Sequence, residues 1–240
     1  MRRWLQQLAT TLPWTLAPGT CVLCGFPSHR RQDLCAVCKA DLRSLPDPCP
    51  RCGLPRPAGA ATTDSCGACQ RHPPRYGRLV AACSYTDPAD LLVRALKFRK
   101  VRAAARVMAE IMWARRPADA FSEEAWLLPV PLHPWRQWRR GFNQSTLIAN
   151  HLARLGPWRV LAGAAGRRRR TRAQSGLSRA DRRRNLANAF RVKPGQLPPS
   201  IVLIDDVVTT GTTLDALALT LRRAGVRDIR AWVFARTPPR

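Results

Sequence analysis

Residues Ile201–Leu214 read IVLIDDVVTTGTTL, and this stretch decides the fold class of the chain. The apolar run Ile201–Ile204 has the length and the β-branched content of a buried parallel strand. Two carboxylates, Asp205 and Asp206, follow where that strand is expected to end. A Thr/Gly turn then leads into a pattern of leucines at helical spacing. Strand, turn and helix in this order predict a parallel α/β sheet.

The turn after the two aspartates indicates a site for a sugar phosphate. Ligands of open α/β sheets bind beyond the carboxyl ends of the strands. Small residues at a helix N-terminus offer backbone N–H groups to an anion, and the helix dipole adds to the attraction. Two acids would repel a phosphate, but they can accept hydrogen bonds from a ribose diol or hold a metal ion. We therefore expect a ribose 5-phosphate. Its phosphate would be held by Thr209, Thr210, Gly211, Thr212 and Thr213.

A purely structural alternative is a strand, a turn and a helix capped by Thr212, with Asp215 three residues later as in a capping box. This alternative accounts for those two residues. It leaves the aspartate pair and the Thr/Gly run unexplained.

The segment resembles the phosphoribosyl-pyrophosphate signature of type I phosphoribosyltransferases. The resemblance implies that Asp205 and Asp206 bind the 2′- and 3′-hydroxyls of the ribose, and that the following loop wraps the 5′-phosphate. It also implies Mg²⁺, bound together with phosphoribosyl pyrophosphate. The 6-oxopurine salvage members carry a third acid where this chain has Thr209. That departure argues against hypoxanthine or guanine as the acceptor.

Eight of the nine cysteines form four C-x-x-C pairs, which indicate metal binding. Two thiolates at this spacing hold one ion, and two such pairs complete a tetrahedral zinc site. Gly25 and Gly53 follow the first and third pairs, where a positive φ lets backbone amides point at sulfur. We expect two structural zinc ions with sequential pairing, while interleaved pairing stays open. The expected ligands are Cys21, Cys24, Cys35 and Cys38 for one ion, and Cys49, Cys52, Cys66 and Cys69 for the other.

Other cysteine chemistry fits the pattern less well. A disulfide scaffold needs a secretory signal, redox C-x-x-C motifs occur singly, and iron–sulfur clusters are less usual at this spacing. The start of the chain is basic and then apolar, but Gln6 and Gln7 interrupt the apolar part. We interpret residues 2–16 as a short amphipathic helix. With no apolar run approaching ~20 residues, we expect no membrane span and a cytoplasmic protein.

The formal net charge is +26, which favours polyanionic partners. The charge is concentrated between Trp135 and Lys193, where Asp181 is the single acid. A GC-rich genome could explain arginine in place of lysine, but it does not create the excess of positive charge.

Strands alternate with helices in the rest of the chain. We expect strands at 78–85, 126–131, 158–162, 201–204 and 229–234, and helices at 88–116, 142–155 and 212–224. The segment 163–187 is Arg-rich and irregular. The predicted domains are residues 1–73, with the N-terminal helix and a double zinc ribbon, and residues 74–240, with the α/β sheet.

Basic segments supply candidate residues for two further ligands. Lys97, Arg139 and Arg140 could bind pyrophosphate. A polar, basic stretch that begins at Thr171 is also consistent with a solvated loop. The candidate residues for single-stranded DNA are Trp135, Trp138, Arg172, Arg182 and Arg184.

The order of these parts resembles the ComF/GntX family of competence-related proteins. The matching elements are the C-x-x-C ribbons, ALKFRK, LPVPLHPWRQWRRGFNQS, TRAQSGLSRADRRRNLANAF and VLIDDVVTTGTTL. The resemblance implies a double zinc ribbon on a type I phosphoribosyltransferase domain. It also implies a role in natural transformation or in the use of external DNA, on the cytoplasmic side of the uptake machinery.

Three functions stay open on the sequence. The chain could be a phosphoribosyltransferase for an unknown acceptor. It could be a single-stranded DNA-binding protein that uses the fold to sense a ligand. It could also be an adaptor whose ribbons dock a helicase or channel of the uptake machinery.

Overall fold

A computed structural model describes residues 19–28, 33–56, 65–167, 189–193, 195 and 197–238. The expected N-terminal helix lies outside these ranges, as do three of the DNA-binding candidates, Arg172, Arg182 and Arg184. Within the described part, no helix combines the length and apolarity needed to cross a membrane.

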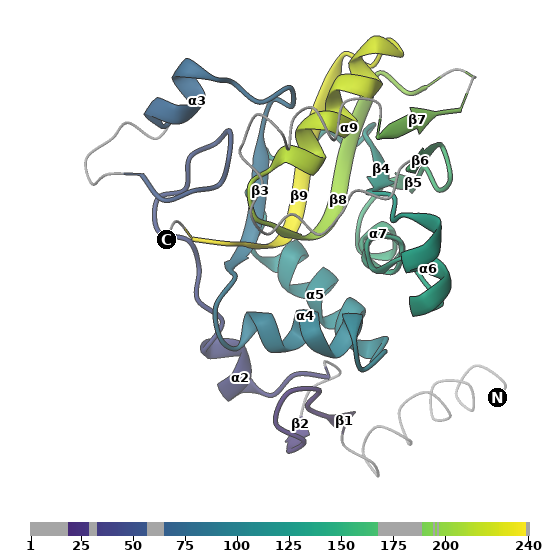
Figure 1. The fold of residues 1–240 in the computed structure, drawn as a ribbon. Helices are drawn as coiled ribbons and strands as arrows, with labels where there is room; N and C mark the ends of the chain where they lie inside the picture. The colour runs from purple at the N-terminus through teal and green to yellow at the C-terminus, as the bar shows by residue number, and fades with distance from the viewer. Residues whose placement is uncertain are drawn as a thin grey trace, which may run out of the picture.

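A parallel sheet of five strands forms the centre of the described structure, which confirms the predicted α/β class (Figure 1). The strand order is β3-β9-β8-β4-β5, and every neighbouring pair is parallel. The strands are β3 Leu79–Ser84, β4 Trp126–Pro129, β5 Arg159–Val160, β8 Ser200–Val208 and β9 Asp228–Arg236. Their carboxyl ends therefore meet at one edge of the sheet.

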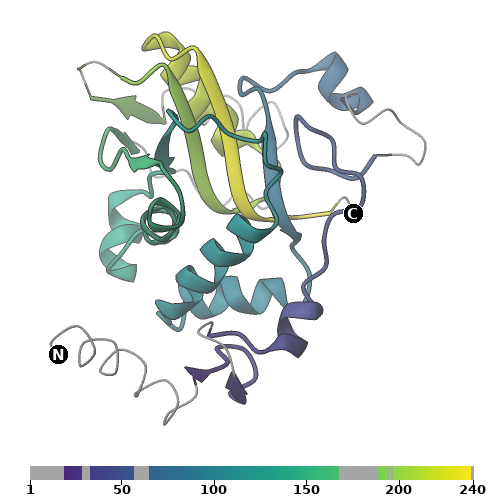
Figure 2. The same cartoon turned by 180° about the vertical axis from the view of Figure 1, so that it is seen from behind.

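Helices cover both faces of this sheet, as the two opposite views show (Figures 1 and 2). The helices are α4 Ala89–Lys97, α5 Ala103–Ala114, α6 Pro134–Arg140, α7 Gln144–Leu155 and α9 Thr212–Arg223. Strand β8 alternates between the two apolar cores. Val202 and Ile204 pack in the core with α4, α5 and α7, whereas Ile201 and Leu203 pack in the core with α9.

The structure corrects two sequence-based expectations. The helix expected over 88–116 is two helices, α4 and α5, and Lys100 between them has a φ of 57°. Helix α6 is an additional element that the sequence analysis did not assign. Strand β8 does not end before the aspartates but continues to Val208, because β9 is equally long and pairs with it as far as Val208↔Arg236. Residues at both ends of the Arg-rich segment also pair, as the antiparallel strands β6 Ala165–Arg167 and β7 Phe190–Val192.

The cysteine-rich residues form two small units on different sides of the sheet (Figures 1 and 2). The first contains strands β1 Gly19–Thr20 and β2 Pro27–Ser28 and helix α2 Ala36–Ala40. Its Leu34 and Leu42 share the core of α4 and α5. The second contains helix α3 Gly67–Arg71 and lies beside β3, where the Leu79 N–H donates to the carbonyl of Pro50 at 2.9 Å. The domain boundary at residue 73 stays a prediction.

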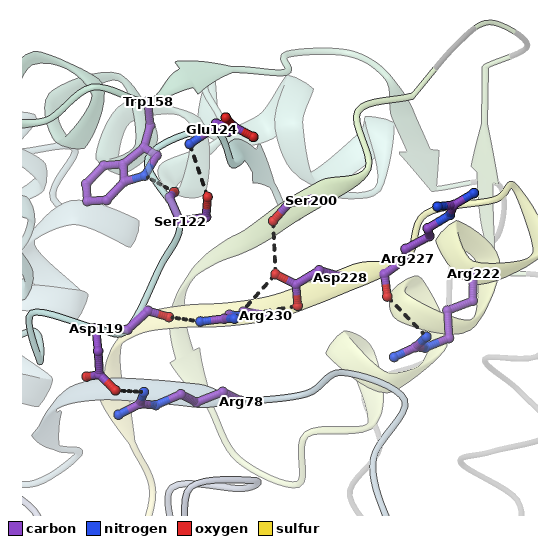
Figure 3. A network of polar contacts seen from close by, with 11 residues as sticks. Arg78, Asp119, Ser122, Glu124, Trp158, Ser200, Arg222, Arg227, Asp228 and Arg230 are labelled. Carbon is purple, nitrogen blue, oxygen red and sulfur yellow. Dashed lines mark hydrogen bonds and ion pairs between the residues drawn. The ribbon is translucent and has the colours of Figure 1, made fainter.

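Polar contacts join the amino ends of the central strands (Figure 3). Ser200 at the start of β8 donates to Asp228 of β9 at 3.0 Å. Arg230 of β9 pairs with the same carboxylate and donates to the carbonyl of Ala120 at 2.7 Å. These side chains satisfy one another, so this end of the sheet has a structural role. The carboxyl end is where side chains are left for a ligand.

Candidate ligand site and metal centres

Asp206 is the buried centre of the candidate ligand site. It is 2% exposed and points to the face of β8 that α4 and α7 cover. Lys97, the last residue of α4, forms an ion pair with one carboxylate oxygen. The side-chain amide of Gln144, the first residue of α7, donates to the other oxygen at 3.2 Å. Burial alone would raise the pKa of Asp206, but the Lys97 charge and these hydrogen bonds hold it below its ordinary value.

Asp205 has the opposite electrostatic environment. Burial, and then the neighbouring Asp206 charge, raise its pKa to about 7. One oxygen of Asp205 accepts hydrogen bonds from the Ser145 hydroxyl and from the backbone N–H of Asp206, each at 2.9 Å. Asp205 is therefore the member of the pair that is close to its titration point at neutral pH.

The start of α7 positions the partners of both aspartates. Asn143 is the N-cap, and its side chain accepts a hydrogen bond from the Ser145 N–H at 3.0 Å. The same side chain donates to the carbonyl of Val130, just after β4, at 3.0 Å. This double contact fixes the first turn of α7 against the sheet. As a result Gln144 and Ser145, which are 4% and 0% exposed, reach the aspartates.

A basic cavity of about 500 Å³ adjoins the aspartates. Gln144 connects the cavity to the aspartates, because it lines the cavity and also contacts Asp206. Arg140 donates a hydrogen bond to the side-chain amide oxygen of Gln144, and burial lowers the pKa of the Arg140 guanidinium. The cavity is lined by Lys97, Phe98, Lys100, Leu132, Trp135, Arg136, Arg139, Arg140 and Gln144. Five cations with no acid among the lining residues suit a ligand with several negative charges.

The Thr/Gly loop continues from β8 into α9 at the same edge of the sheet. Gly211, with a φ of 77°, is the N-cap of α9, and the first N–H groups of a helix have no acceptor within it. The hydroxyls of Thr210 and Thr212 lie 2.7 Å apart. The capping box is absent: Thr212 is already helical, and Asp215 forms an ion pair with Arg75 at 2.5 Å. The loop can therefore offer N–H groups and hydroxyls to an anion.

Arg236, the last residue of β9, contacts the start of this loop. The residue is 4% exposed, and its guanidinium donates to the carbonyls of Val208 and Thr209 and to that of Cys52 in the second cysteine unit. A cavity of about 120 Å³ lies between that unit and the loop, and Tyr76 lines it. Burial raises the pKa of the Tyr76 hydroxyl above its ordinary value.

The eight cysteines of the C-x-x-C pairs gather as two groups of four, in the sequential order. The sulfur atoms of each group lie within 4.8 Å of one another. The Cys24 and Cys35 sulfurs are 3.8 Å apart, and those of Cys52 and Cys66 are 3.7 Å apart. Thiolates at ~2.3 Å from zinc at the corners of a tetrahedron lie about 3.8 Å apart. The two clusters therefore fit two structural zinc sites.

Backbone amides support the thiolate form in these clusters. The N–H of Cys38 points at the Cys35 sulfur at 3.4 Å, and the N–H of Cys66 points at the Cys49 sulfur at 3.3 Å. Burial alone would raise the pKa of Cys49, but hydrogen bonds from backbone N–H groups lower it to about 7. Four thiolates leave no open coordination position, so such a zinc would have a structural role.

The structure brings some of the sequence-predicted residues together and separates others. Lys97, Arg139, Arg140 and Trp135 line one cavity. Trp138 is 81% exposed and does not line it. The roles of Ser145, Arg236 and Lys100 were not predicted. The side-chain amide of Gln144, within the motif RGFNQS, contacts Asp206.

Comparison with known proteins identifies a double zinc ribbon and relatives that match nearly the whole chain. A double zinc ribbon domain matches residues 13–70. The chain is 38% identical over 228 residues to DNA utilization protein YhgH of Salmonella typhimurium, which covers 92% of this chain and 98% of that protein. It is 34% identical over 225 residues to competence protein F of Haemophilus influenzae, covering 90% and 96% of the two chains. Competence protein ComFC of Streptococcus pneumoniae is 32% identical over 115 residues, about half of each protein.

Proposed function

Because this chain belongs to the ComF/GntX family, together with DNA utilization protein YhgH and competence protein F, we propose that it binds phosphoribosyl pyrophosphate while serving the uptake or use of DNA. Membership of this family supports the role in DNA uptake. The binding of phosphoribosyl pyrophosphate is a further step that family membership does not supply. The observation behind that step is the basic cavity joined to Asp206 through Lys97 and Gln144, at the edge of the sheet that also carries the Thr/Gly loop.

The aspartates would bind the ribose. A carboxylate accepts hydrogen bonds from two adjacent hydroxyls, and a buried one does so with little competition from water. Both oxygens of Asp206 already have partners, Lys97 and Gln144, so the ribose would contact Asp205 first. The 5′-phosphate would then bind the loop at residues 209–213, where the N-terminus of α9 favours an anion.

The pyrophosphate would occupy the basic cavity. Lys97, Arg139 and Arg140 supply charge-assisted hydrogen bonds, and they would also stabilise a pyrophosphate that leaves the ribose. The lining residues include no carboxylate, so Mg²⁺ would enter with the ligand and use its phosphate oxygens. As an enzyme, the protein would transfer the phosphoribosyl group to an acceptor and release pyrophosphate. A pyrophosphate-release screen over bases and oligonucleotides tests it.

Calorimetry with phosphoribosyl pyrophosphate and Mg²⁺ tests the binding. We expect Arg140→Gln to weaken it about tenfold or more, since a hydrogen bond to a charged group contributes ~1.5–3 kcal/mol. Arg223→Gln is the matched control, because Arg223 is exposed in the last turn of α9, away from the cavity. Equal affinities for the wild type and both variants, or no binding by the wild type, would contradict the proposal.

A second function is binding of single-stranded DNA by the same face of the molecule. The observation that favours it is helix α6, which carries Trp138 at 81% exposed and Trp135 at 40% exposed beside Arg136 and Arg139. Indole rings stack on unpaired bases, and arginines hold the backbone phosphates. A DNA strand on α6 would pass the mouth of the basic cavity. A cytoplasmic location and contacts with an uptake helicase or channel belong to the same proposal.

A further inference from the structure

Arg236 connects the second cysteine cluster to the Thr/Gly loop. Its Nε donates to the carbonyl of Cys52 at 2.8 Å. Its Nη1 donates to the carbonyls of Val208 at 3.1 Å, of Thr209, and of Thr237 at 3.1 Å. One buried side chain thus contacts both a metal-ligating knuckle and the first residue of the loop.

Two further contacts strengthen this connection. Tyr76 lines the small cavity together with Cys52 and Cys69, and its hydroxyl would lie 3.3 Å from a Cβ added at Gly211. Arg75 forms an ion pair with Asp215 in the first turn of α9, and its backbone N–H donates to the same carboxylate at 2.8 Å. The chain that leaves the second cluster therefore packs near Gly211 of the loop and against the first turn of α9.

The charge of Arg236 also points to the metal centre. The acceptors of its hydrogen bonds are backbone carbonyls, and within the described residues no carboxylate contacts it. A buried cation needs compensating negative charge. Zinc with four thiolates carries a net charge of about −2, and this centre would be the source of that charge.

The first cluster has different neighbours. Asp33 forms an ion pair with Arg106 of α5, and Arg115 donates to the carbonyl of Leu42 at 2.8 Å. These contacts lead to the core under α4 and α5. None of the contacts described for the first cluster reaches residues 209–213.

We propose that the second metal centre sets the conformation, and with it the phosphate affinity, of the Thr/Gly loop, with Arg236 as the positioning residue between them. The first metal centre does not have this role. The inference rests on the proposed binding of phosphoribosyl pyrophosphate for its affinity readout. Metal loss at one ribbon would then switch off the ligand site without unfolding the sheet.

A matched pair of substitutions in the full chain tests the difference between the two centres. Cys35 and Cys66 are the equivalent N-cap residues of α2 and α3, and both are half-buried. Serine is a favourable N-cap residue but binds zinc poorly. We expect each variant to lose one zinc by metal analysis. Cys66→Ser should weaken phosphoribosyl-pyrophosphate binding about tenfold or more in calorimetry, and Cys35→Ser should not.

A second variant keeps both metals and removes only the connection. We expect Arg236→Gln to retain two zinc ions but to bind the ligand about tenfold more weakly, with partial recovery in Arg236→Lys. Full affinity in Arg236→Gln or in zinc-depleted Cys66→Ser would overturn the inference and leave the proposed function intact. No binding by the wild type would instead overturn the proposed function.

A measurement on the wild type alone covers the case in which a variant does not fold. Hydrogen exchange in this loop is read at the Asp215 N–H, which donates to the carbonyl of Gly211 at 3.0 Å, while a chelator removes zinc, and it needs no ligand. We expect exchange in this loop to accelerate when the second centre loses its metal, while the amides of β4 stay protected. Unchanged loop exchange after loss of that metal would overturn the inference.

Discussion

Asp205 and Asp206 are neighbours in β8, yet their surroundings shift their pKa values in opposite directions. Asp206 has a cation and an amide as partners, so its charge is stabilised inside the protein. Asp205 has a hydroxyl and a backbone N–H and lies next to that charge. A sequence shows two equal acids. Their difference arises because Lys97 at the end of α4 pairs with Asp206, whereas the hydrogen-bond donors to Asp205 are neutral.

This difference predicts a pH dependence of stability. The pKa of Asp205 rises from 3.8 to about 7 on folding, so folding takes up a proton between those values. The contribution of Asp205 to stability is therefore complete below about pH 4 and is lost as the pH rises through about 7. We expect the wild type to lose stability relative to Asp205→Asn as the pH rises from about 5 to 8. The difference between their free energies of unfolding, measured in urea, should therefore shift in favour of the variant. Glu124→Gln, at an exposed acid, should follow the wild type. Parallel curves for Asp205→Asn and the wild type would contradict the assignment.

The elements of the sheet could be predicted because burial leaves a pattern in the sequence. Strands β3, β8 and β9 and helix α9 follow from apolar runs and leucines at helical spacing. The break between α4 and α5 could not be predicted, since residues 98–102 contain neither glycine nor proline. It depends on tertiary contacts, which place Lys97 at the end of α4 on Asp206.

The site was predictable to the extent that its chemistry lies in one segment. The aspartates and the Thr/Gly loop are contiguous, and their functional groups suffice to suggest a sugar phosphate. The contributions of Ser145 and Arg236 require knowledge of which helix and which strand end lie nearby. Spacing in the sequence contains no such information, because 60 residues separate Ser145 from Asp205.

The two ends of α9 offer a matched test of the loop. Gly211 and Gly225 both have positive φ, 77° and 94°, but only Gly211 lies in the loop. We expect alanine at either position to cost roughly 1–2 kcal/mol of stability in thermal or urea unfolding. A Cβ at position 211 would also meet the Tyr76 hydroxyl. At position 225, no described residue other than its chain neighbours comes within 4 Å of an added Cβ. Gly211→Ala alone should therefore weaken phosphoribosyl-pyrophosphate binding in calorimetry. Equal binding by both variants would exclude the loop from the site.

The whole molecule has a net charge of +26, and its described part contains a basic cavity beside a helix, α6, that exposes two indoles. Charge of this size attracts any polyanion, so DNA binding by itself would not locate a site. Stacking of a base on a side chain does locate a DNA-binding site, because it requires an aromatic ring at a particular place. Trp138 on α6 and Phe26 on the first cysteine unit are both largely exposed, at 81% and 71%, and Trp138 shares its helix with Arg136 and Arg139.

We expect affinity for single-stranded DNA to fall steeply with salt and to show little dependence on base sequence. Trp138→Ala should lose ~1–3 kcal/mol at every salt concentration, because stacking on a base is not screened. Arg139→Gln should instead reduce the slope of log affinity against log salt by about 1, as expected for one lost phosphate contact. Phe26→Ala should bind like the wild type. Filter binding at two or more salt concentrations measures all four proteins. If Trp138→Ala and Phe26→Ala behave alike while Arg139→Gln still weakens binding of phosphoribosyl pyrophosphate, then the arginines of α6 serve the small ligand, and DNA binds elsewhere or not at all.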